Sequence, residues 1–170
     1  MSAASEISPP EKLSAEHDLS GFDSGEPVLD DWLRRRARQN EESGSSRTYV
    51  VCVGKRVGAY YTLAVGAIAH AEAPGRIRRS MPDPVPATLL GQLAVDREFQ
   101  GQGHAASLLL FALLTALVAS ESIGSLGVMT HPLDDVVRGF YARWGFQDLP
   151  FDPRRAMFVR MVDLRTSFAE

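Results

Sequence analysis

With 170 residues and a net charge of −3, the chain is long enough for one domain with a sizeable core, and its acidity argues against a strongly basic nucleic-acid binder. Residues 108–118 form an apolar run too short to cross a membrane. The single cysteine, Cys52, excludes an internal disulfide framework and a cysteine zinc cluster, so we expect no metal site. The start, MSAASEISPPEK, lacks a basic region and the apolar core of a signal peptide, which predicts a cytoplasmic protein without membrane contact.

The first third of the chain predicts a strand, a helix and a hairpin. Residues 1–11 are small and polar with a Pro-Pro pair, and we expect a disordered start before one domain over residues 12–170. A first strand is expected within residues 12–22. Ser24-Gly25-Glu26-Pro27 is typical of a helix start, and apolar residues at helical spacing extend that helix to about Asn40. The β-rich runs 48–53 and 57–65 predict an antiparallel hairpin.

The remainder alternates strands and helices. Residues 71–86 hold four prolines and predict a long loop between strands, of the kind that often faces substrate. Residues 89–95 predict a buried strand, which a leucine-rich helix follows from Ser107. We then expect strand 124–130, helix 134–144 with Gly145 as its left-handed cap, strand 157–162 and a polar tail. This order favours an α/β or α+β fold, a sheet layered with helices.

The turn between that central strand and helix has the features of an anion site. Its sequence is Gln100-Gly101-Gln102-Gly103-His104-Ala105. Glycines let the backbone approach a phosphate closely, and the free N–H groups and dipole of a helix N-terminus attract negative charge. No Gly-Lys-Ser/Thr sequence follows, which excludes a P-loop.

Arginine outnumbers lysine sixteen to two, and the arginines cluster. Their planar forks pair with phosphates, so local patches suit an RNA backbone on an acidic protein. The first cluster has an equally good structural explanation, because basic residues late in a helix that starts with acidic ones complement its dipole. Both interpretations stay open. The clusters are Arg34, Arg35, Arg36 and Arg38; Arg76, Arg78 and Arg79; and Arg154 and Arg155.

Gln100, Gly103 and Ala105 fit the pattern Q/R-x-x-G-x-G/A, which cradles the acetyl-CoA pyrophosphate in the Gcn5-related N-acetyltransferase (GNAT) superfamily. Four longer segments resemble one GNAT subgroup, the acetyltransferase toxins of bacterial toxin–antitoxin pairs. The resemblance covers residues 21–161 and departs from the subgroup at Gln92, where many members carry arginine, and at Ala105, where they carry glycine. The segments are FDSGEPVLDDWLRRRARQNEESGSSRTYVV, YYTLA, PVPATLLGQLAVDREFQGQGHA and THPLDDVVRGFYARWGFQ.

This resemblance implies a fold and a reaction. The GNAT fold is a mixed, mostly antiparallel sheet with flanking helices, in which strands 89–95 and 125–130 run parallel and splay apart around the pantetheine arm of acetyl-CoA. The toxins transfer acetyl from acetyl-CoA to the free α-amino group of an aminoacyl-tRNA. The resemblance also implies a homodimer and a ribbon-helix-helix antitoxin as partner.

It further implies roles for single residues. Tyr141 would protonate the leaving thiolate, a task that suits a neutral phenol; on base rates of aromatic burial alone it would be a core residue. A backbone N–H of the strand Leu93-Ala94-Val95 would polarise the thioester carbonyl. The amide of Gln100 would reach a phosphate, whereas we expect no acid–base role for His104, His131 or Glu98. The cofactor would be bound by Leu93, Ala94, Val95, Gln100, Gly101, Gln102, Gly103, His104, Ala105 and Ala106, and the tRNA by Arg34, Arg35, Arg78 and Arg79.

Two other functions remain open at this point. An ordinary GNAT enzyme would acetylate a small amine, an antibiotic or a protein N-terminus, and it would not need a basic face. A GNAT-fold module without enzymatic activity would act only by binding an antitoxin or regulator.

Overall fold

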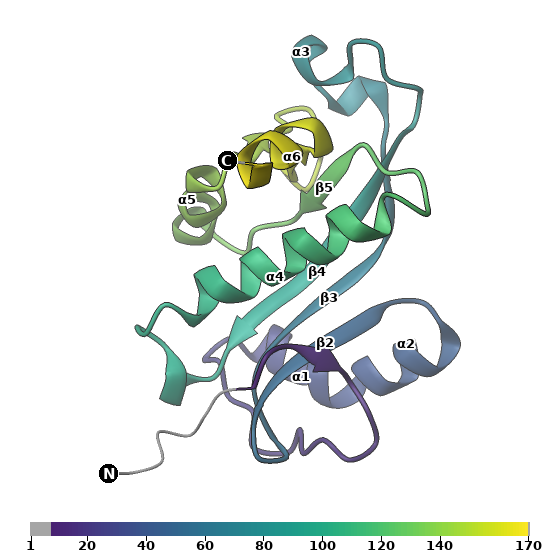
Figure 1. The fold of residues 1–170 in the computed structure, drawn as a ribbon. Helices are drawn as coiled ribbons and strands as arrows, with labels where there is room; N and C mark the ends of the chain where they lie inside the picture. The colour runs from purple at the N-terminus through teal and green to yellow at the C-terminus, as the bar shows by residue number, and fades with distance from the viewer. Residues whose placement is uncertain (1–7, 170) are drawn as a thin grey trace. The chain divides into compact units, whose positions relative to one another are not determined.

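The computed structural model describes residues 8–169, and within them seven strands form one mixed sheet with flanking helices (Figure 1). Hydrogen-bonded neighbours give the order β1-β2-β3-β4-β5-β7-β6. The β4–β5 pair is parallel, and the predicted α/β (α+β) class with a parallel pair in a mostly antiparallel sheet is confirmed. The strands are β1 Glu11–Lys12, β2 Arg47–Val53, β3 Arg56–Ile68, β4 Val85–Val95, β5 Gly127–Thr130, β6 Gln147–Asp148 and β7 Met157–Arg160.

The helices confirm part of the predicted order and add to it. They are α1 Pro27–Arg35, α2 Ala37–Ser43, α3 Gly75–Arg78, α4 His104–Ala119, α5 Asp135–Arg143 and α6 Met161–Ala169, with 3-10 turns η1 His70–Glu72 and η2 Arg97–Phe99. No helix in the described part of the chain is long and apolar enough to span a membrane. The chain divides into two compact units, residues 1–64 with 91–112 and residues 65–90 with 113–170, which are described separately.

In the first unit, an apolar core fills the space between β2, β3 and α1. Tyr60 of β3 is its centre: the ring meets Phe22 edge-on at 5.4 Å and stacks on Trp32 at 6.1 Å. Its hydroxyl donates to the Leu29 carbonyl at 2.6 Å, so the buried phenol is satisfied. This core fixes α1 against the sheet, and α2 contacts β2.

The helix predicted from Pro27 to Asn40 is in fact two helices. Arg36 leaves helical geometry with φ −117° and ψ −31°, and α2 starts at the next residue. The sequence contains no glycine or proline at the break. Leu33 before the bend and Ala37 after it are both fully buried, so the apolar core continues across the break.

The chain start also differs from expectation. The strand expected within residues 12–22 is only the two-residue β1, and Asp18 adds an isolated bridge to Arg56. Part of the expected disordered start, residues 1–7, lies outside the described residues. The rest is attached to the sheet: the Ser8 N–H donates to the Cys52 carbonyl at 3.2 Å, and Glu11 pairs with Val50.

In the second unit, the proline-rich loop closes over a second core. Its helix α3 buries Ile77 against Ile68, Val85, Met129 and Phe158. The strand β4 begins at Val85, four residues before the prediction, and the chain ends in α6 where a polar tail was expected. Met161 and Leu164 of α6 are buried, which explains why these residues do not trail into solvent.

Candidate functional site

The glycine turn lies between the end of β4 at Val95 and the start of α4 at His104. Gly101 and Gly103 have φ of +76° and +84°, a conformation that side chains with a Cβ rarely adopt. A Cβ built on either glycine meets no atom within 4 Å. The glycines therefore satisfy the backbone geometry, and the space in front of them is open to a ligand.

The backbone N–H groups of this turn are without partners. From Gly101 to Ala106, none donates to any group in the described residues, and Ser107 is the first that does, to the Gly103 carbonyl at 3.2 Å. The last three belong to the first turn of α4, a sixteen-residue helix whose N-terminus carries partial positive charge. Six outward donors at a helix N-terminus form a cradle suited to a pyrophosphate.

Buried polar contacts hold the turn in place. Asp96, 3% exposed, accepts N–H groups from Asp23 and Glu98, both at 3.0 Å, and lies 3.5 Å from the Arg56 guanidinium. The amide nitrogen of Gln100 donates to the carbonyls of Ser24 at 2.8 Å and Val95 at 2.7 Å. The sequence interpretation assigned that amide to a phosphate. Here both of its hydrogens go to protein, so Gln100 shapes the cradle rather than reaching into it.

The remaining predicted cofactor residues occupy the end of β4 and the first turn of α4. Ala94 and Val95 are buried and Leu93 is half-buried. The parallel ladder pairs Thr88 with Val128, Leu89 with Met129 and Leu90 with Thr130, and β4 continues five residues beyond it. The predicted parallel pairing is confirmed, whereas the splay beyond Leu90 stays a prediction. The ring of His104 packs edge-on against Phe99 at 6.4 Å.

Tyr141 is buried on α5, with 4% of its surface exposed. Its ring lies 5.3 Å from that of Phe140 and 5.2 Å from that of Phe146. Burial raises the pKa of the phenol to about 12, and the nearby Thr130 side chain opposes this only in part. The phenol is therefore protonated at physiological pH, as an acid for a leaving thiolate must be, although its packing equally fits a core residue.

His131 follows β5, next to Thr130. Burial and the nearby Arg154 lower its pKa, and Asp152 opposes them. The imidazole is therefore neutral near pH 7.

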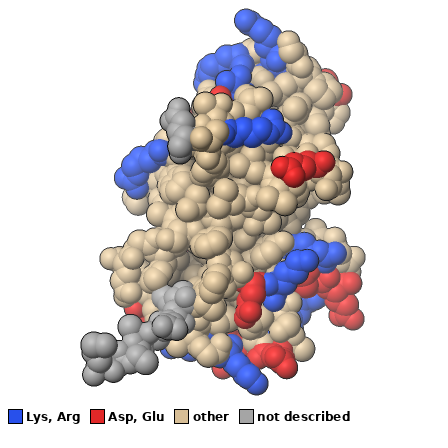
Figure 2. Space-filling view, viewed as in Figure 1, with Lys and Arg blue, Asp and Glu red and all other residues tan. Residues whose placement is uncertain are grey.

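The four arginines predicted to contact substrate fall into two classes. Arg34 donates to the Phe22 carbonyl at 2.6 Å and Arg78 to the His70 carbonyl at 3.0 Å, so both are partly engaged by the fold. Arg35 and Arg79 are exposed, and their guanidinium groups have no partner within the described residues. Figure 2 shows basic side chains gathered over the segment that carries α3, whereas acidic and basic side chains mix around α2. Arg35 and Arg79 are thus the better candidates for an external phosphate.

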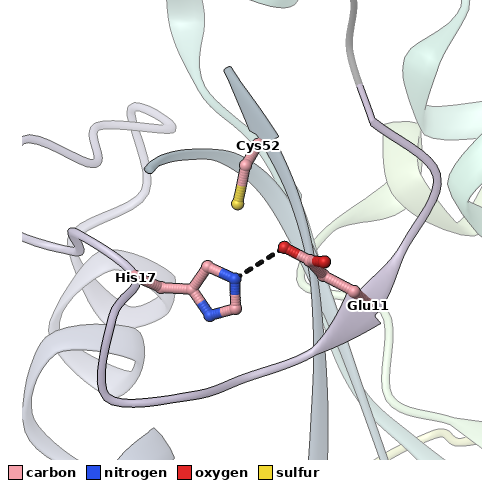
Figure 3. Close-up of side chains that lie close together, drawn as sticks. All are labelled: Glu11, His17 and Cys52. Atoms are coloured by element: carbon pink, nitrogen blue, oxygen red, sulfur yellow. Dashed lines mark hydrogen bonds and ion pairs between the residues drawn. The ribbon is translucent and has the colours of Figure 1, made fainter. Parts of the chain in front are cut away.

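The sequence analysis did not anticipate a cluster formed by Glu11, His17 and Cys52, which we call the N-terminal clasp (Figure 3). The Ser14 N–H donates to His17 Nδ1 at 2.9 Å, so Nε2 carries the proton and donates to Glu11 Oε1 at 2.7 Å. Burial, then the charge of Glu11, raises the pKa of Cys52 to about 11. The donor atoms lie within 4.8 Å of one another. The contacts of the clasp hold the N-terminal segment next to β2.

Comparisons with known proteins agree with the site. No protein-family model matches this chain. A tRNA-acetylating toxin of Mycobacterium tuberculosis (strain ATCC 25618 / H37Rv) is 47% identical over 158 residues, which are 93% of this chain and 95% of the relative.

Solved structures of the toxin AtaT share the fold. AtaT complexed with acetyl-methionyl-tRNAfMet has a TM-score of 0.87 and 29% identity, covering 94% of this chain and 98% of AtaT. A tyrosine-to-phenylalanine mutant of AtaT, bound to the C-terminus of the antitoxin AtaR and acetyl-CoA, has a TM-score of 0.83 and 28% identity, covering 95% and 98%. The high identity to a curated relative over nearly both chains, together with this likeness of fold, shows that the chain belongs to the tRNA-acetylating toxins, GNAT-type N-acetyltransferases that depend on acetyl-CoA.

Proposed function

We propose that this chain transfers acetyl from acetyl-CoA to the α-amino group of an aminoacyl-tRNA, with the pyrophosphate of the cofactor bound on the glycine turn. The observation that carries the proposal is the row of six N–H groups from Gly101 to Ala106 without protein partners. Unpaired donors at two left-handed glycines and a helix N-terminus are available to an anionic ligand. Leu93, Ala94 and Val95 complete the cofactor site by facing the pantetheine arm.

The reaction needs few groups from the protein. The neutral amine attacks the thioester carbon, a C–N bond forms, the C–S bond breaks, and the amine proton passes to solvent. A backbone N–H of residues 93–95 stabilises the oxyanion, and Tyr141 gives its proton to the coenzyme A thiolate. The phenol keeps its proton throughout the working range, and contact with the sulfur in the transition state must offset the weaker acidity that its raised pKa brings.

The arginines supply the affinity for RNA. Arg35 and Arg79 are the exposed, unengaged members of the predicted set, and a guanidinium fork pairs well with a phosphate. Arg78 contributes through the charge that its backbone contact leaves exposed, whereas Arg34 also pairs with Asp31 at 3.3 Å and contributes less. We further propose that the protein acts in the cytoplasm as a homodimer, neutralised by a ribbon-helix-helix antitoxin. The complexes of AtaT with AtaR support an antitoxin partner.

The test is incubation of the purified protein with labelled acetyl-CoA and a panel of charged tRNAs. Deacylated tRNA and a small primary amine serve as comparison acceptors. We expect label on one or more charged tRNAs and none on deacylated tRNA, because the acceptor is the α-amine. Label on the small amine with none on any charged tRNA would replace this proposal with a small-amine acetyltransferase.

A further inference from the structure

Gln92 of β4 is held by Thr62 of β3 in a way that the cofactor site does not require. The Thr62 hydroxyl donates to Gln92 Oε1 at 2.7 Å and accepts the backbone N–H of Gln92 at 3.0 Å. Thr62 is 2% exposed, so this hydroxyl must find its partners inside the protein. Gln92 supplies both.

These contacts fix the direction of the Gln92 amide. The opposite orientation would place the amide nitrogen on the Thr62 hydroxyl, whose own hydrogen would then lack an acceptor among the described residues. A buried hydroxyl left unsatisfied is costly, so the observed orientation is preferred. The amide nitrogen of Gln92 has no partner in the described residues, and its two N–H groups are left to a ligand.

Gly91 makes room for this arrangement. A Cβ at Gly91 would lie 2.7 Å from the Thr62 hydroxyl oxygen, closer than real Cβ contacts allow. The φ angle of Gly91 is not in the positive range, so its backbone conformation does not require glycine. Its lack of a side chain serves instead to admit the Thr62 hydroxyl next to Gln92.

Thr62 follows Tyr60 by two residues in β3, and Gln92 precedes Ala94 by two residues in β4. Tyr60 and Ala94 belong to the core that packs against α1. Gln92 is half-buried and precedes Leu93, the first of the three residues whose backbone we assign to the thioester carbonyl.

We propose that Gln92 is a positioning residue for the acceptor, and that its amide donates to the ester carbonyl of the aminoacyl group. This inference rests on the proposed function. A neutral donor suits that carbonyl, which is joined through one carbon to the reacting amine. A carboxylate at this place would hold the amine as an ammonium ion, whereas the amide orients the group and leaves the nitrogen lone pair free.

The experiment compares an amino-acid ethyl ester with the matching amino ethyl ether, which differ only in the carbonyl. The two are compared at equal concentrations of neutral amine, because the ester carbonyl also lowers the pKa of the amine. Wild type should favour the ester, and Gln92→Met, with similar length but no donor, should lose this preference. With charged tRNA, kcat/KM should fall about tenfold to a hundredfold, the loss of one oriented hydrogen bond in a partly buried site. For Gln92→Glu, kcat/KM should fall further, because a carboxylate, which only accepts hydrogen bonds, then faces the carbonyl oxygen.

Controls separate positioning from folding. Gln39→Met changes an exposed glutamine on α2 and should leave both activities unchanged, and acetyl-CoA binding by calorimetry should be the same in every variant. Thr62→Val should lower the ester preference and Thr62→Ser should restore it. An unchanged ester preference and unchanged kcat/KM in both Gln92 variants would overturn the inference while the proposed function stands. A wild-type protein that acetylates neither charged tRNA nor the ester would overturn both.

Discussion

The glycine turn and the N-terminal clasp belong to the same compact unit and treat polar groups in opposite ways. In the clasp, each ring nitrogen of His17 has a partner and the thiol of Cys52 is buried and protonated. In the turn, the backbone N–H groups from Gly101 to Ala106 have no partner within the described residues. Paired groups stabilise a fold, whereas unpaired donors in a rigid frame are available to a ligand.

The difference separates a structural cluster from a functional one. Residue type alone points the wrong way, because Glu, His and Cys are the usual metal ligands and the turn offers only glycines and amides. The hydrogen-bond partners give the opposite assignment: the groups of the clasp are paired within the protein, and the N–H groups of the turn are not. The predictions below ask whether changes in the turn affect binding and changes in the clasp affect stability.

The largest effect is expected for Gly103→Glu, which should abolish acetyl-CoA binding measured by calorimetry. The new side chain fills the open space before the N–H groups and adds negative charge where a pyrophosphate must lie. Gly54→Glu is the matched control: Gly54 also has positive φ, +61°, and open space around its Cβ, so the backbone strain is comparable. Equal loss of binding in both variants would assign the effect to strain and remove the turn from the cofactor site.

Tyr141→Phe tests a residue that does not follow this division, since Tyr141 is buried like Cys52 of the clasp but is assigned to catalysis. The variant should bind acetyl-CoA normally and lose about 10² to 10⁴ in turnover, the usual worth of a positioned acid. Single-turnover acetylation of charged tRNA measures it. Near wild-type turnover with lowered stability would make Tyr141 a core residue.

The pH dependence of the wild-type acetylation rate also tests whether Tyr141 is the catalytic acid. Because burial raises the pKa of Tyr141 to about 12, the free enzyme keeps this proton well above neutral pH. The rate should therefore rise with pH near 7 to 8, as the substrate α-amine loses its proton, and then level off. A fall in rate between about pH 8 and 10 would show that an acid with a lower pKa is at work.

A smaller effect is expected for Arg79→Glu, an exposed arginine with no protein partner. Affinity for charged tRNA should fall several-fold, and the slope of its logarithm against log salt should decrease by about 1 for the lost phosphate contact. Arg165→Glu, an exposed arginine on α6, is the control with the same charge change. If both variants respond alike, overall charge rather than a defined contact governs affinity.

The smallest effect is expected in the clasp. His17→Ala removes the bonds to Ser14 and Glu11 and should lower the free energy of unfolding by about 1 kcal/mol. Alkylation of Cys52 at pH 8, slow in wild type because the thiol is buried with a pKa of about 11, should accelerate. Acetyl-CoA binding should be unchanged. Loss of binding in this variant would mean that the two regions are not separable.

Local signals made much of this fold and site predictable. Alternating β-rich runs and the glycine turn located β2, β3 and the end of β4, whereas α4 starts at His104, three residues before the prediction. Gly145 follows α5 with the predicted positive φ, +90°. The bend at Arg36 was not predicted, because no glycine or proline marks it. The terminal helix α6 was not predicted either, because it depends on tertiary burial of Met161 and Leu164. The hydrogen bond from Gln100 to Ser24 was not predicted either, because the two residues are 76 positions apart in sequence.

The contacts that fasten the turn have a consequence for protein synthesis. Asp96 accepts from Asp23, 73 residues earlier in sequence, and Gln100 donates to Ser24. A nascent chain that ends before residue 106 lacks part of the cradle, and contacts this distant in sequence form late in folding. The ribosome must therefore build well over half of the polypeptide before a cofactor-binding turn can exist, so a cell that translates such a toxin is protected from its short, unfinished fragments.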